Sequence, residues 1–441
     1  MKLWRQLKIV INKFAIKSVN KYHIITIGCQ MNFSDSERMA SFLDDLGYVE
    51  TDKRTEAALI IINTCGIKQT SESRIYGLVP QLKKNNPLVK IVITGCVSDR
   101  PDVKRRMRQV DMWLPIKDMT KLAEFLQVTT NDKSLPESYL AIAPKYVSKI
   151  SAQVPIGTGC DNFCSYCVVP YARGRETYRK VLEIIDEVKS LVARGYREIN
   201  LVAQNVNSYH DQDDGFVDLL KKINDIPGDF WIRFMSSHPK DMSEKLIKTI
   251  SELEKVCEHV HLPVQSGDDE VLVRMNRKYT GNHYMELITM IRSYMPNASI
   301  TTDIIVGFPG ETEEQFQNTV KLVEWANFDN IYLGKFSPRP FTVAAKLKDD
   351  VTLGEKKRRE EVLMKIVRRT AAQNHQKKIG QVQAILVEEK SKGMFYGRTN
   401  DNTFVKIITK DVVDELAGKF IKVKITEARD FGMDGEIIYE K

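Results

Sequence analysis

The sequence lacks any apolar run of the roughly 20 residues that a membrane-spanning helix needs. It also lacks the apolar core of a secretory signal, because Lys8, Lys13 and Lys17 interrupt its first residues. We therefore expect a cytoplasmic protein with no stable membrane association. The apolar residues between positions 3 and 14 have helical spacing and predict an amphipathic helix that docks on the protein itself, with a membrane surface as the alternative.

Cysteine is scarce as well, since the 441 residues include only seven. Without an export signal these thiols are expected to stay reduced, so metal binding is the main alternative to burial. A content of 42% hydrophobic and 28% charged residues is that of an ordinary folded protein. The formal net charge of +8 favours polyanionic partners without identifying one.

The length predicts two or three domains. In the first of them, three apolar runs predict strands: HIITIGC (23–29), ALIIINTC (58–65) and KIVITGC (90–96). Ser34 and Glu37 match a capping box that would open a helix after the first run, and residues 101–110 predict a helix after the third. This alternation is typical of a parallel α/β sheet. We place the domain at residues 21–135, where the polar stretch 129–138 breaks the pattern.

A second series of strands and helices follows at residues 146–376. Six runs predict strands: QVPIGTGC (153–160), EINLVAQNV (198–206), FWIRFMS (230–236), HVHLPVQSG (259–267), ASITTDIIVGF (298–308) and NIYLGKFS (330–337). Helical stretches such as residues 179–195 separate them. Six units in this length favour an incomplete (βα)6 barrel over the eight-unit form. A charged helix at residues 353–380 closes the region, with Gly380 as its stop.

The remaining residues, 378–441, have a different sequence pattern from the regions before them. Short β-rich runs separated by Gly, Asn and Asp predict a small antiparallel barrel: QVQAILVEE, MFYGRT, TFVKIIT, KFIKVKITEAR and GEIIYE. Such barrels bind single-stranded nucleic acid with basic and exposed aromatic side chains. Phe395, Tyr396, Arg398 and Phe404 are the candidates for this role. The basic helix around residues 356–369 contains glutamates and predicts a salt-bridged face instead.

The strongest motif is GCDNFCSYCVVP, in which Cys160, Cys164 and Cys167 form a C-x3-C-x2-C run that we call the cysteine loop. A [4Fe–4S] cluster normally takes four cysteine ligands, so three of them leave one iron open to another ligand. The alternative is a zinc site. Zinc needs four ligands with paired C-x2-C spacing, and no fourth candidate lies nearby in the sequence. The spacing therefore favours an iron–sulfur cluster.

A second set, the strand-end cysteines, consists of Cys29, Cys65 and Cys96. Each lies at the carboxyl end of one predicted strand of the first domain. Loops at the carboxyl ends of parallel strands converge on one crevice, so we expect these three thiols to meet. Three buried thiols are the alternative, but burial does not explain their common position. Cys257 has neither partner nor spacing and is expected to be a buried structural thiol.

The segment GCDNFCSYCVVPYARGRE resembles the radical S-adenosylmethionine (SAM) signature of tRNA and ribosomal methylthiotransferases. IITIGCQMNFSDSE resembles the opening of their N-terminal domain, and residues 378–441, which include GRTNDN, resemble their RNA-binding TRAM domain. The resemblance covers nearly the whole chain in the family's order. Cys-Gln-Met-Asn at residues 29–32 is most similar to the MiaB-type branch.

The resemblance implies transfer of a methylthio group to C2 of N6-isopentenyladenosine at tRNA position 37, with two SAM molecules used per product. It implies that a [4Fe–4S] cluster on the cysteine loop cleaves SAM to a 5′-deoxyadenosyl radical and that a second cluster on the strand-end cysteines carries the sulfur. A radical suits the C2–H bond, which is not acidic enough for a side-chain base. The implied partners are the tRNA anticodon stem-loop, a one-electron donor such as a flavodoxin or ferredoxin, and an unidentified sulfur donor. We expect a monomer.

Five further residues are candidates for SAM binding. Tyr166 occupies the aromatic position just before the last cysteine of the loop. Asn205, Arg233, Gln265 and Asp303 lie at or near predicted strand ends, where the sites of barrel enzymes gather. An ordinary structural role is the alternative for each. Three histidines are expected to be packed or solvent-facing rather than metal ligands: His238, His259 and His261.

Other functions stay open at this point. Within the same chemistry, the substrate can instead be N6-threonylcarbamoyladenosine in tRNA or a ribosomal protein. A non-catalytic RNA-binding protein with structural iron–sulfur clusters belongs to a different class. A zinc-binding protein of tRNA modification is the third alternative.

Overall fold

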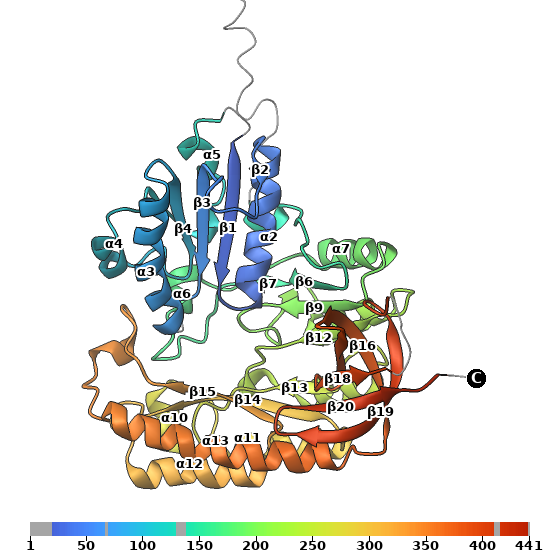
Figure 1. The fold of residues 1–441 in the computed structure, drawn as a ribbon. Coiled ribbons are helices and arrows are strands. Elements are labelled where there is room, and N and C mark those ends of the chain that lie inside the picture. The colour runs from blue at the N-terminus through green and yellow to red at the C-terminus, as the bar shows by residue number, and fades with distance from the viewer. Residues whose placement is uncertain (1–19, 67–68, 129–137, 410–414, 440–441) are drawn as a thin grey trace, which may run out of the picture. The chain divides into compact units, whose positions relative to one another are not determined.

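In a computed structural model (Figure 1), the chain is described at residues 20–66, 69–128, 138–409 and 415–439. It divides into two compact units, Met1–Lys145 and Tyr146–Lys441. The predicted N-terminal amphipathic helix lies outside the described residues, as does nearly all of the predicted boundary stretch 129–138. Within the described part of the chain, no helix is both long and apolar enough to cross a membrane.

The first unit is built on one parallel sheet of five strands in the order β2-β1-β3-β4-β5. The strands are β1 (Lys21–Ile27), β2 (Val49–Glu50), β3 (Leu59–Thr64), β4 (Lys90–Gly95) and β5 (Met112–Leu114). The helices are α2 (Gln30–Asp45), α3 (Gln69–Asn85), α4 (Pro101–Arg106) and α5 (Lys121–Phe125). The three long strands β1, β3 and β4 run side by side (Figure 1) and correspond to the three predicted runs.

Helices cover both faces of this sheet. On one face, Met39 and Leu43 of α2 pack in a cluster with Leu59 of β3. On the other face, Ile75 and Val79 of α3 belong to a second cluster with the alternate residues of the strands. Burial on both faces is why the strands are continuous runs of β-branched residues. The predicted parallel α/β domain is confirmed.

The predicted start of helix α2 is wrong. The helix begins at Gln30 rather than at Ser34, and Ser34 and Glu37 are buried inside it. Cys29 occupies the N-cap position, and its backbone N–H donates to Oδ1 of Asn32 at 3.2 Å. The sequence template failed because it looked for a serine or threonine cap, whereas here the amide side chain of Asn32 closes the first turn.

The second unit contains the six predicted parallel strands, arranged as two three-stranded sheets, β12-β9-β6 and β13-β14-β15. They are β6 (Ser151–Pro155), β9 (Glu198–Val202), β12 (Trp231–Phe234), β13 (His259–His261), β14 (Ser299–Val306) and β15 (Asn330–Lys335). Short antiparallel pairs are β7 (Gly157–Thr158) with β8 (Thr177–Tyr178) and β10 (His210–Asp211) with β11 (Asp214–Gly215). The helices are α6 (Val169–Arg173), α7 (Val181–Ala193), α8 (Phe216–Asn224), α9 (Glu244–Glu252), α10 (Asp269–Arg274), α11 (Gly281–Tyr294), α12 (Glu313–Ala326) and α13 (Leu353–Gln376).

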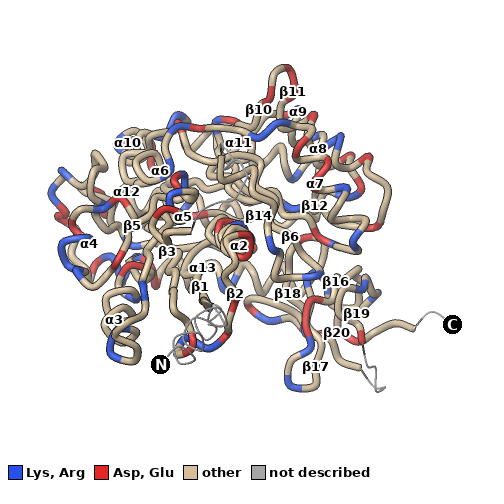
Figure 2. The backbone as a smooth tube through the Cα atoms, turned by 90° about the horizontal axis from the view of Figure 1, so that it is seen from above, with Lys and Arg blue, Asp and Glu red and all other residues tan. Residues whose placement is uncertain are grey.

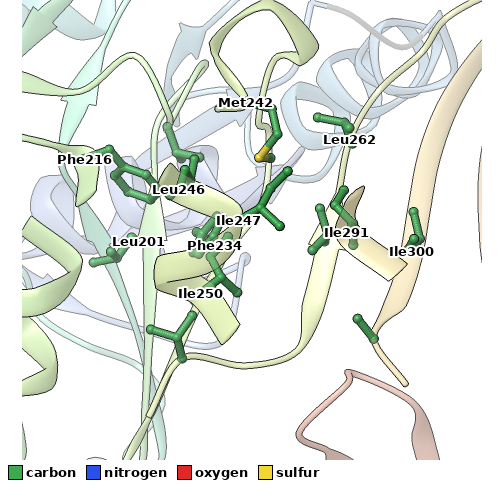
Figure 3. Close-up of a cluster of buried hydrophobic side chains, with 14 of the residues drawn as sticks. Leu201, Phe216, Phe234, Met242, Leu246, Ile247, Ile250, Leu262, Ile291 and Ile300 are labelled. Atoms are coloured by element: carbon green, nitrogen blue, oxygen red, sulfur yellow. The ribbon is translucent and has the colours of Figure 1, made fainter. Parts of the chain in front are cut away.

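One large apolar core lies between these strands and helices. Figure 3 shows part of it, where Leu246 and Ile250 of α9 lie close to Phe234 of β12. The amphipathic helices bury their apolar faces here and expose their charged faces. The predicted (βα)6 arrangement of the core is confirmed, and its carboxyl strand ends are free to carry loops.

Helix α13 ends at Gln376, and Gly380 follows with a left-handed φ of +83°. Acidic and basic residues are interspersed along the backbone tube (Figure 2). On α13, Arg359 pairs with Glu311 at 2.7 Å and Arg369 pairs with Glu324 at 3.2 Å. The exposed pair of Arg369 and Glu324 agrees with the solvated, salt-bridged face expected from the sequence, whereas Arg359 and Glu311 are buried, so this face is only partly solvated.

The C-terminal residues form a closed five-stranded barrel in the order β16-β17-β18-β20-β19. The strands are β16 (Val382–Ser391), β17 (Met394–Thr399), β18 (Phe404–Ile408), β19 (Phe420–Arg429) and β20 (Gly432–Ile437). The predicted barrel is confirmed, but it is not wholly antiparallel, because β18 and β20 pair in parallel. Strand β19 separates these two strands in the sequence, so they close the barrel without a hairpin between them.

A buried group of charges joins this barrel to the β9 and β12 strands. Glu198 is fully buried and pairs with Arg233 at 2.5 Å and with Arg398 at 3.3 Å. The two terminal nitrogens of Arg233 donate to the backbone oxygens of Thr399 and Asn400, each at 2.7 Å. The barrel is thus packed on the parallel strands of its own unit through specific polar contacts.

Candidate functional site

The cysteine loop follows a tight turn whose position 159 accepts only glycine. Gly159 has a φ of +83°, and a Cβ there would lie 2.0 Å from the backbone oxygen of Arg175. The backbone N–H of Cys160 donates to the oxygen of Gly174 at 3.2 Å, and that of Cys167 donates to the oxygen of Cys164 at 2.9 Å. The first bond ties the start of the run to Gly174, and the second closes a turn between its last two cysteines.

A second segment, residues 274–277, braces the cysteine loop. Ser165 donates from its backbone N–H to the oxygen of Met275 at 3.0 Å and from its hydroxyl to the oxygen of Arg274 at 2.8 Å. The side-chain amide of Asn276 donates to the oxygen of Phe163 at 2.9 Å. The loop is therefore fixed from outside its own sequence by the end of helix α10.

The thiol of Cys160 is protonated before any metal binds. Burial raises the pKa of Cys160 to about 11, and the amide of Asn162 lies 3.5 Å from its sulfur. Iron binds the thiolate, so loading of this site must displace protons.

The strand-end cysteines are gathered at one edge of the first unit's sheet. Cys29 follows β1, Cys65 follows β3 and Cys96 follows β4, and these three strands are neighbours. The backbone N–H of Cys65 donates to the oxygen of Ile27 at 2.8 Å, and that of Cys96 donates to the oxygen of Thr64 at 3.0 Å. Three distant parts of the sequence thus end on neighbouring strands, and the meeting of the three thiols stays a prediction.

An amide network supports this edge. Asn32 and Asn63 are fully buried, and the side-chain nitrogen of Asn32 donates to Oδ1 of Asn63 at 2.9 Å. In return, the side-chain nitrogen of Asn63 donates to the oxygen of Asn32 at 2.8 Å and to the hydroxyl of Ser36 at 3.0 Å. Because Asn32 also caps the turn at Cys29, this network connects two of the cysteine-bearing strand ends.

Both cysteine sets offer thiol donors, which suit an iron–sulfur cluster. Among the described residues, no group of three or more His, Cys, Asp or Glu is placed to hold one metal ion. Two buried hydroxyls have no hydrogen-bond partner among the described residues, those of Thr64 in β3 and Thr94 in β4, the strands that Cys65 and Cys96 follow. The donor chemistry of the two sets therefore fits a cluster.

The predicted SAM residues lie in different settings. Tyr166 packs against a small apolar cluster that includes Phe308. The side-chain nitrogen of Asn205 donates to Asp241 at 2.8 Å, while its buried oxygen has no hydrogen-bond partner. Among the described residues, that oxygen therefore has an unfilled bonding capacity.

Gln265 and Asp303 are joined through the backbone. The N–H of Gln265 donates to the oxygen of Asp303 at 2.8 Å, and Gln265 has a left-handed φ of +72°. The carboxylate of Asp303 stays 39% exposed and lies 3.6 Å from His261. Arg233 instead binds Glu198 and the end of β17, so its contacts join the barrel to the strands, and its place in the SAM site stays a prediction.

The three histidines are held within the core. His259 and His261 share the hydroxyl of Thr301, at 2.9 and 3.0 Å, and Nδ1 of His238 accepts from the backbone N–H of Lys240 at 3.2 Å. Burial lowers the pKa of His259 to about 3, so this ring is neutral at pH 7. These bonds bear out the packed role expected for the three rings.

The last of the seven cysteines, Cys257, is buried as expected. Only 2% of its side chain is exposed. Burial raises the pKa of its thiol to about 12, so the group is neutral at pH 7. It therefore behaves as a structural thiol of the second unit's core.

The four candidate RNA contacts on the barrel differ in how exposed they are and in what they already bind. Phe395 is 3% exposed and is a core residue, which corrects its selection. Phe404 is 46% exposed and stacks on Tyr396 with ring centroids 5.5 Å apart. Arg398 is engaged by Glu388 and Glu198. The exposed Phe404 and the half-buried Tyr396 therefore form a stacked aromatic pair at the barrel surface.

Sequence reasoning missed Arg277 and Asn63. A guanidinium nitrogen of Arg277 lies 3.3 Å from the sulfur of Cys164, although the two residues are far apart in the sequence. No local pattern marks it. Asn63 was visible as a lone amide in a buried apolar strand, two residues before Cys65, and that burial was a usable signal.

Comparison with known proteins agrees with this architecture. Three family models match the chain: "Uncharacterized protein family UPF0004" at residues 21–115, the radical SAM superfamily at 154–323 and the TRAM domain at 376–438. The tRNA-2-methylthio-N(6)-dimethylallyladenosine synthase of Thermoanaerobacter pseudethanolicus is 41% identical, covering 95% of this chain and 92% of its own. The synthase of the same name from Caldicellulosiruptor saccharolyticus is 43% identical with the same coverage of both chains.

The chain belongs to the tRNA-2-methylthio-N(6)-dimethylallyladenosine synthase family. The sequence-based assignment to the radical SAM methylthiotransferases is therefore confirmed, and with it the cofactors of that family, SAM and [4Fe–4S] clusters. Among solved structures, the radical SAM methyltransferase TsrM from Kitasatospora setae, with cobalamin and a [4Fe–4S] cluster bound, has a TM-score of 0.54 at 13% identity, covering 83% of this chain and 80% of its own. This likeness concerns the fold.

Proposed function

We propose that the protein transfers a methylthio group to C2 of N6-isopentenyladenosine at tRNA position 37, next to the anticodon. The observation that carries the proposal is the presence of two separate cysteine sets in a chain of this family. The C2–H bond is replaced by a C2–S bond. One SAM supplies the methyl group. A second SAM is cleaved after one-electron reduction to methionine and a 5′-deoxyadenosyl radical, which takes the hydrogen atom from C2 and leaves as 5′-deoxyadenosine, and the electron left over when the C2–S bond forms returns to the sulfur-supplying cluster.

We assign the ligands as follows. Cys160, Cys164 and Cys167 hold one [4Fe–4S] cluster and leave one iron for SAM. The strand-end cysteines hold the second cluster. When bound, the first cluster supplies the electron that cleaves SAM, and the second supplies sulfur. The protein keeps the loop closed by the bonds from residues 274–277 and keeps the strand ends together by the Asn32 and Asn63 amides.

The SAM site is proposed to include Asn205, Tyr166, Gln265 and Asp303. Asn205 is the best supported of them, because its buried side-chain oxygen has no partner and can accept a bond from the amino group of SAM. The exposed carboxylate of Asp303 suits a ribose hydroxyl. Arg233 is the fifth proposed member of the SAM site, and its guanidinium also pairs with Glu198 at 2.5 Å.

The tRNA is proposed to bind across the barrel, where Tyr396 and Phe404 offer a stacking surface. The target base must leave the anticodon stack to reach the radical.

We propose a cytoplasmic monomer with three functional parts, residues 21–135, 146–376 and 378–441, reduced by a flavodoxin or ferredoxin. The sulfur donor is a further partner.

The decisive experiment uses the full chain, loaded with iron and sulfide without oxygen, together with SAM and dithionite. One sample receives tRNA carrying N6-isopentenyladenosine and a matched sample receives tRNA carrying N6-threonylcarbamoyladenosine. Mass spectrometry of the nucleosides should show the methylthio product in the first sample only. Product in the second sample alone would assign the other substrate, and absence of 5′-deoxyadenosine in both would indicate a non-catalytic RNA-binding protein.

A further inference from the structure

Arg277 is a buried cation beside the cysteine loop. Its side chain is 7% exposed, and one terminal nitrogen lies 3.3 Å from the sulfur of Cys164. The other terminal nitrogen donates to the oxygen of Pro263 at 2.8 Å, and Nε donates to the hydroxyl of Tyr279 at 2.7 Å. All three sides of the guanidinium are thus fixed, so it cannot turn away from the sulfur.

The hydroxyl that holds Arg277 is itself fixed. Tyr279 donates to the oxygen of Val264 at 2.8 Å, just beyond the end of β13. The backbone N–H of Arg277 donates to the oxygen of Leu272 at 2.9 Å, which anchors it to helix α10. The guanidinium is therefore placed by two elements of the second unit and not by the cysteine loop itself.

The charge of Arg277 has no carboxylate to balance it. None of the ion pairs between described residues includes Arg277, and the partners of its N–H groups are a carbonyl, a phenol and a thiol. Burial raises the pKa of Tyr279 to about 12, so the phenol is neutral at pH 7. The nearby His238 is neutral too, because burial and the charge of Arg277 lower its pKa to about 2. A buried charge without a counter-charge is costly.

A cluster ligand at Cys164 supplies that counter-charge. A deprotonated sulfur bonded to iron is a negatively charged acceptor, and a charge-assisted hydrogen bond to it is stronger than one to a neutral thiol. Hydrogen bonds and net charge around the sulfurs set the reduction potential of iron–sulfur clusters. Addition of one electron makes the cluster more negative by one charge, so a fixed cation beside it favours the reduced form.

We propose that Arg277 is a positioning residue that holds Cys164 by a hydrogen bond and raises the reduction potential of the SAM-cleaving cluster. The proposal rests on the proposed function, since it requires Cys164 to be a cluster ligand. In the reduction step, one electron passes from the external donor to the cluster, the donor is oxidised, and no proton or bond is exchanged at Arg277.

The test measures the cluster's midpoint potential by redox titration followed with electron paramagnetic resonance. The full chain is used with Cys29, Cys65 and Cys96 replaced by alanine, so that only the cysteine loop can carry a cluster. Arg277→Gln keeps donors and removes the charge, and Arg277→Lys keeps the charge. Arg292→Gln is the matched control, because Arg292 also donates to carbonyls, at 2.9 and 3.1 Å, but in a different part of the unit.

We expect Arg277→Gln to lower the midpoint potential of the cluster by at least about 59 mV, which makes the equilibrium for one-electron reduction about tenfold less favourable. Arg277→Lys should recover most of this shift, and Arg292→Gln should leave the potential unchanged. An intact cluster with an unchanged potential in Arg277→Gln would overturn the proposal.

If Arg277→Gln holds no iron, Arg277→Lys decides the matter. It must hold a cluster near the parent potential, and a loss of iron or a shifted potential there would also overturn the proposal. The parent protein separates a failure of the Arg277 proposal from a failure of the proposed function. Absence of a [4Fe–4S] signal before any change at Arg277 would contradict the proposed function instead.

Discussion

The two cysteine sets are made in opposite ways. The cysteine loop lies within residues 160–167, so one short stretch of sequence determines the spacing of its three cysteines. The strand-end cysteines are spread over residues 29–96 and come to one edge of the sheet only because β1, β3 and β4 are neighbouring strands. A local turn fixes the first set, and the topology of a whole unit fixes the second.

This difference has consequences for stability and for chemistry. The cysteine loop depends on a glycine and on bonds from residues 274–277, whereas the strand-end set depends on strand pairing and a buried amide network. The two sets also lie in different compact units. A change that damages one set should therefore leave the other intact.

The largest expected effects come from the ligands themselves. Cys164→Ala should abolish both 5′-deoxyadenosine formation and methylthiolation, whereas Cys65→Ala should abolish methylthiolation alone. Loss of a residue that only supports a ligand costs about 10- to 100-fold in activity, so loss of a ligand should exceed about a hundredfold. Chromatography measures both products, and Cys257→Ala serves as the control. Full methylthiolation by Cys65→Ala would end the two-cluster account.

Next in size is the removal of the buried charge of Glu198. Burial raises its pKa, but Arg233 and Arg398 outweigh this and lower it to about 2. Because the usual value is 4.5, the ionised group stabilises the fold above pH 4.5, and this contribution is lost as the pH falls toward 2. Glu198→Gln should destabilise the second unit by about 3–5 kcal/mol and flatten this acid dependence. In calorimetry, the transition of the first unit should not move.

Two glycines allow a matched test of the two sets. A Cβ on Gly159 would lie 2.0 Å from the oxygen of Arg175, and one on Gly95 would lie 2.4 Å from the oxygen of Thr64. Each substitution by alanine should cost about 1–3 kcal/mol through backbone strain. Gly159→Ala should lower iron only on the cysteine loop, and Gly95→Ala only on the strand-end set. Gly195→Ala is the control for backbone strain alone, since its φ of +90° is equally left-handed but its added Cβ meets nothing within 4 Å; it should cost stability without loss of iron from either set.

The smallest expected effect probes the amide network. Ser36→Ala removes the hydroxyl that accepts from Asn63 at 3.0 Å and bonds Thr26 at 2.8 Å. The loss of such bonds should destabilise the first unit by about 1 kcal/mol. Urea unfolding measures this change, and iron on the cysteine loop should be unaltered. A loss of iron from both sets would mean that they are not independent.

The features that could be predicted from the sequence are those that a local pattern of residues encodes. Runs such as residues 58–65 and 90–96 identified the strands, because burial on both faces requires continuous apolar residues. The strand-end set was predictable for the same reason. Once the strands were located, the positions of Cys65 and Cys96 followed.

Other features depend on contacts that sequence patterns do not encode. Helix α2 begins at Gln30 because Asn32 caps its first turn, which the serine template did not anticipate. The parallel pairing of β18 with β20 follows from closure of the barrel. Arg277 reaches Cys164 only through the tertiary fold.

Iron content tests the central claim most directly. The full chain, loaded without oxygen, should bind roughly eight irons, four for each cluster. The variant in which Cys160, Cys164 and Cys167 are alanine should keep about four, and so should the variant in which Cys29, Cys65 and Cys96 are alanine. If either triple variant kept all of its iron or lost all of it, the account of two independent cluster sites would be contradicted.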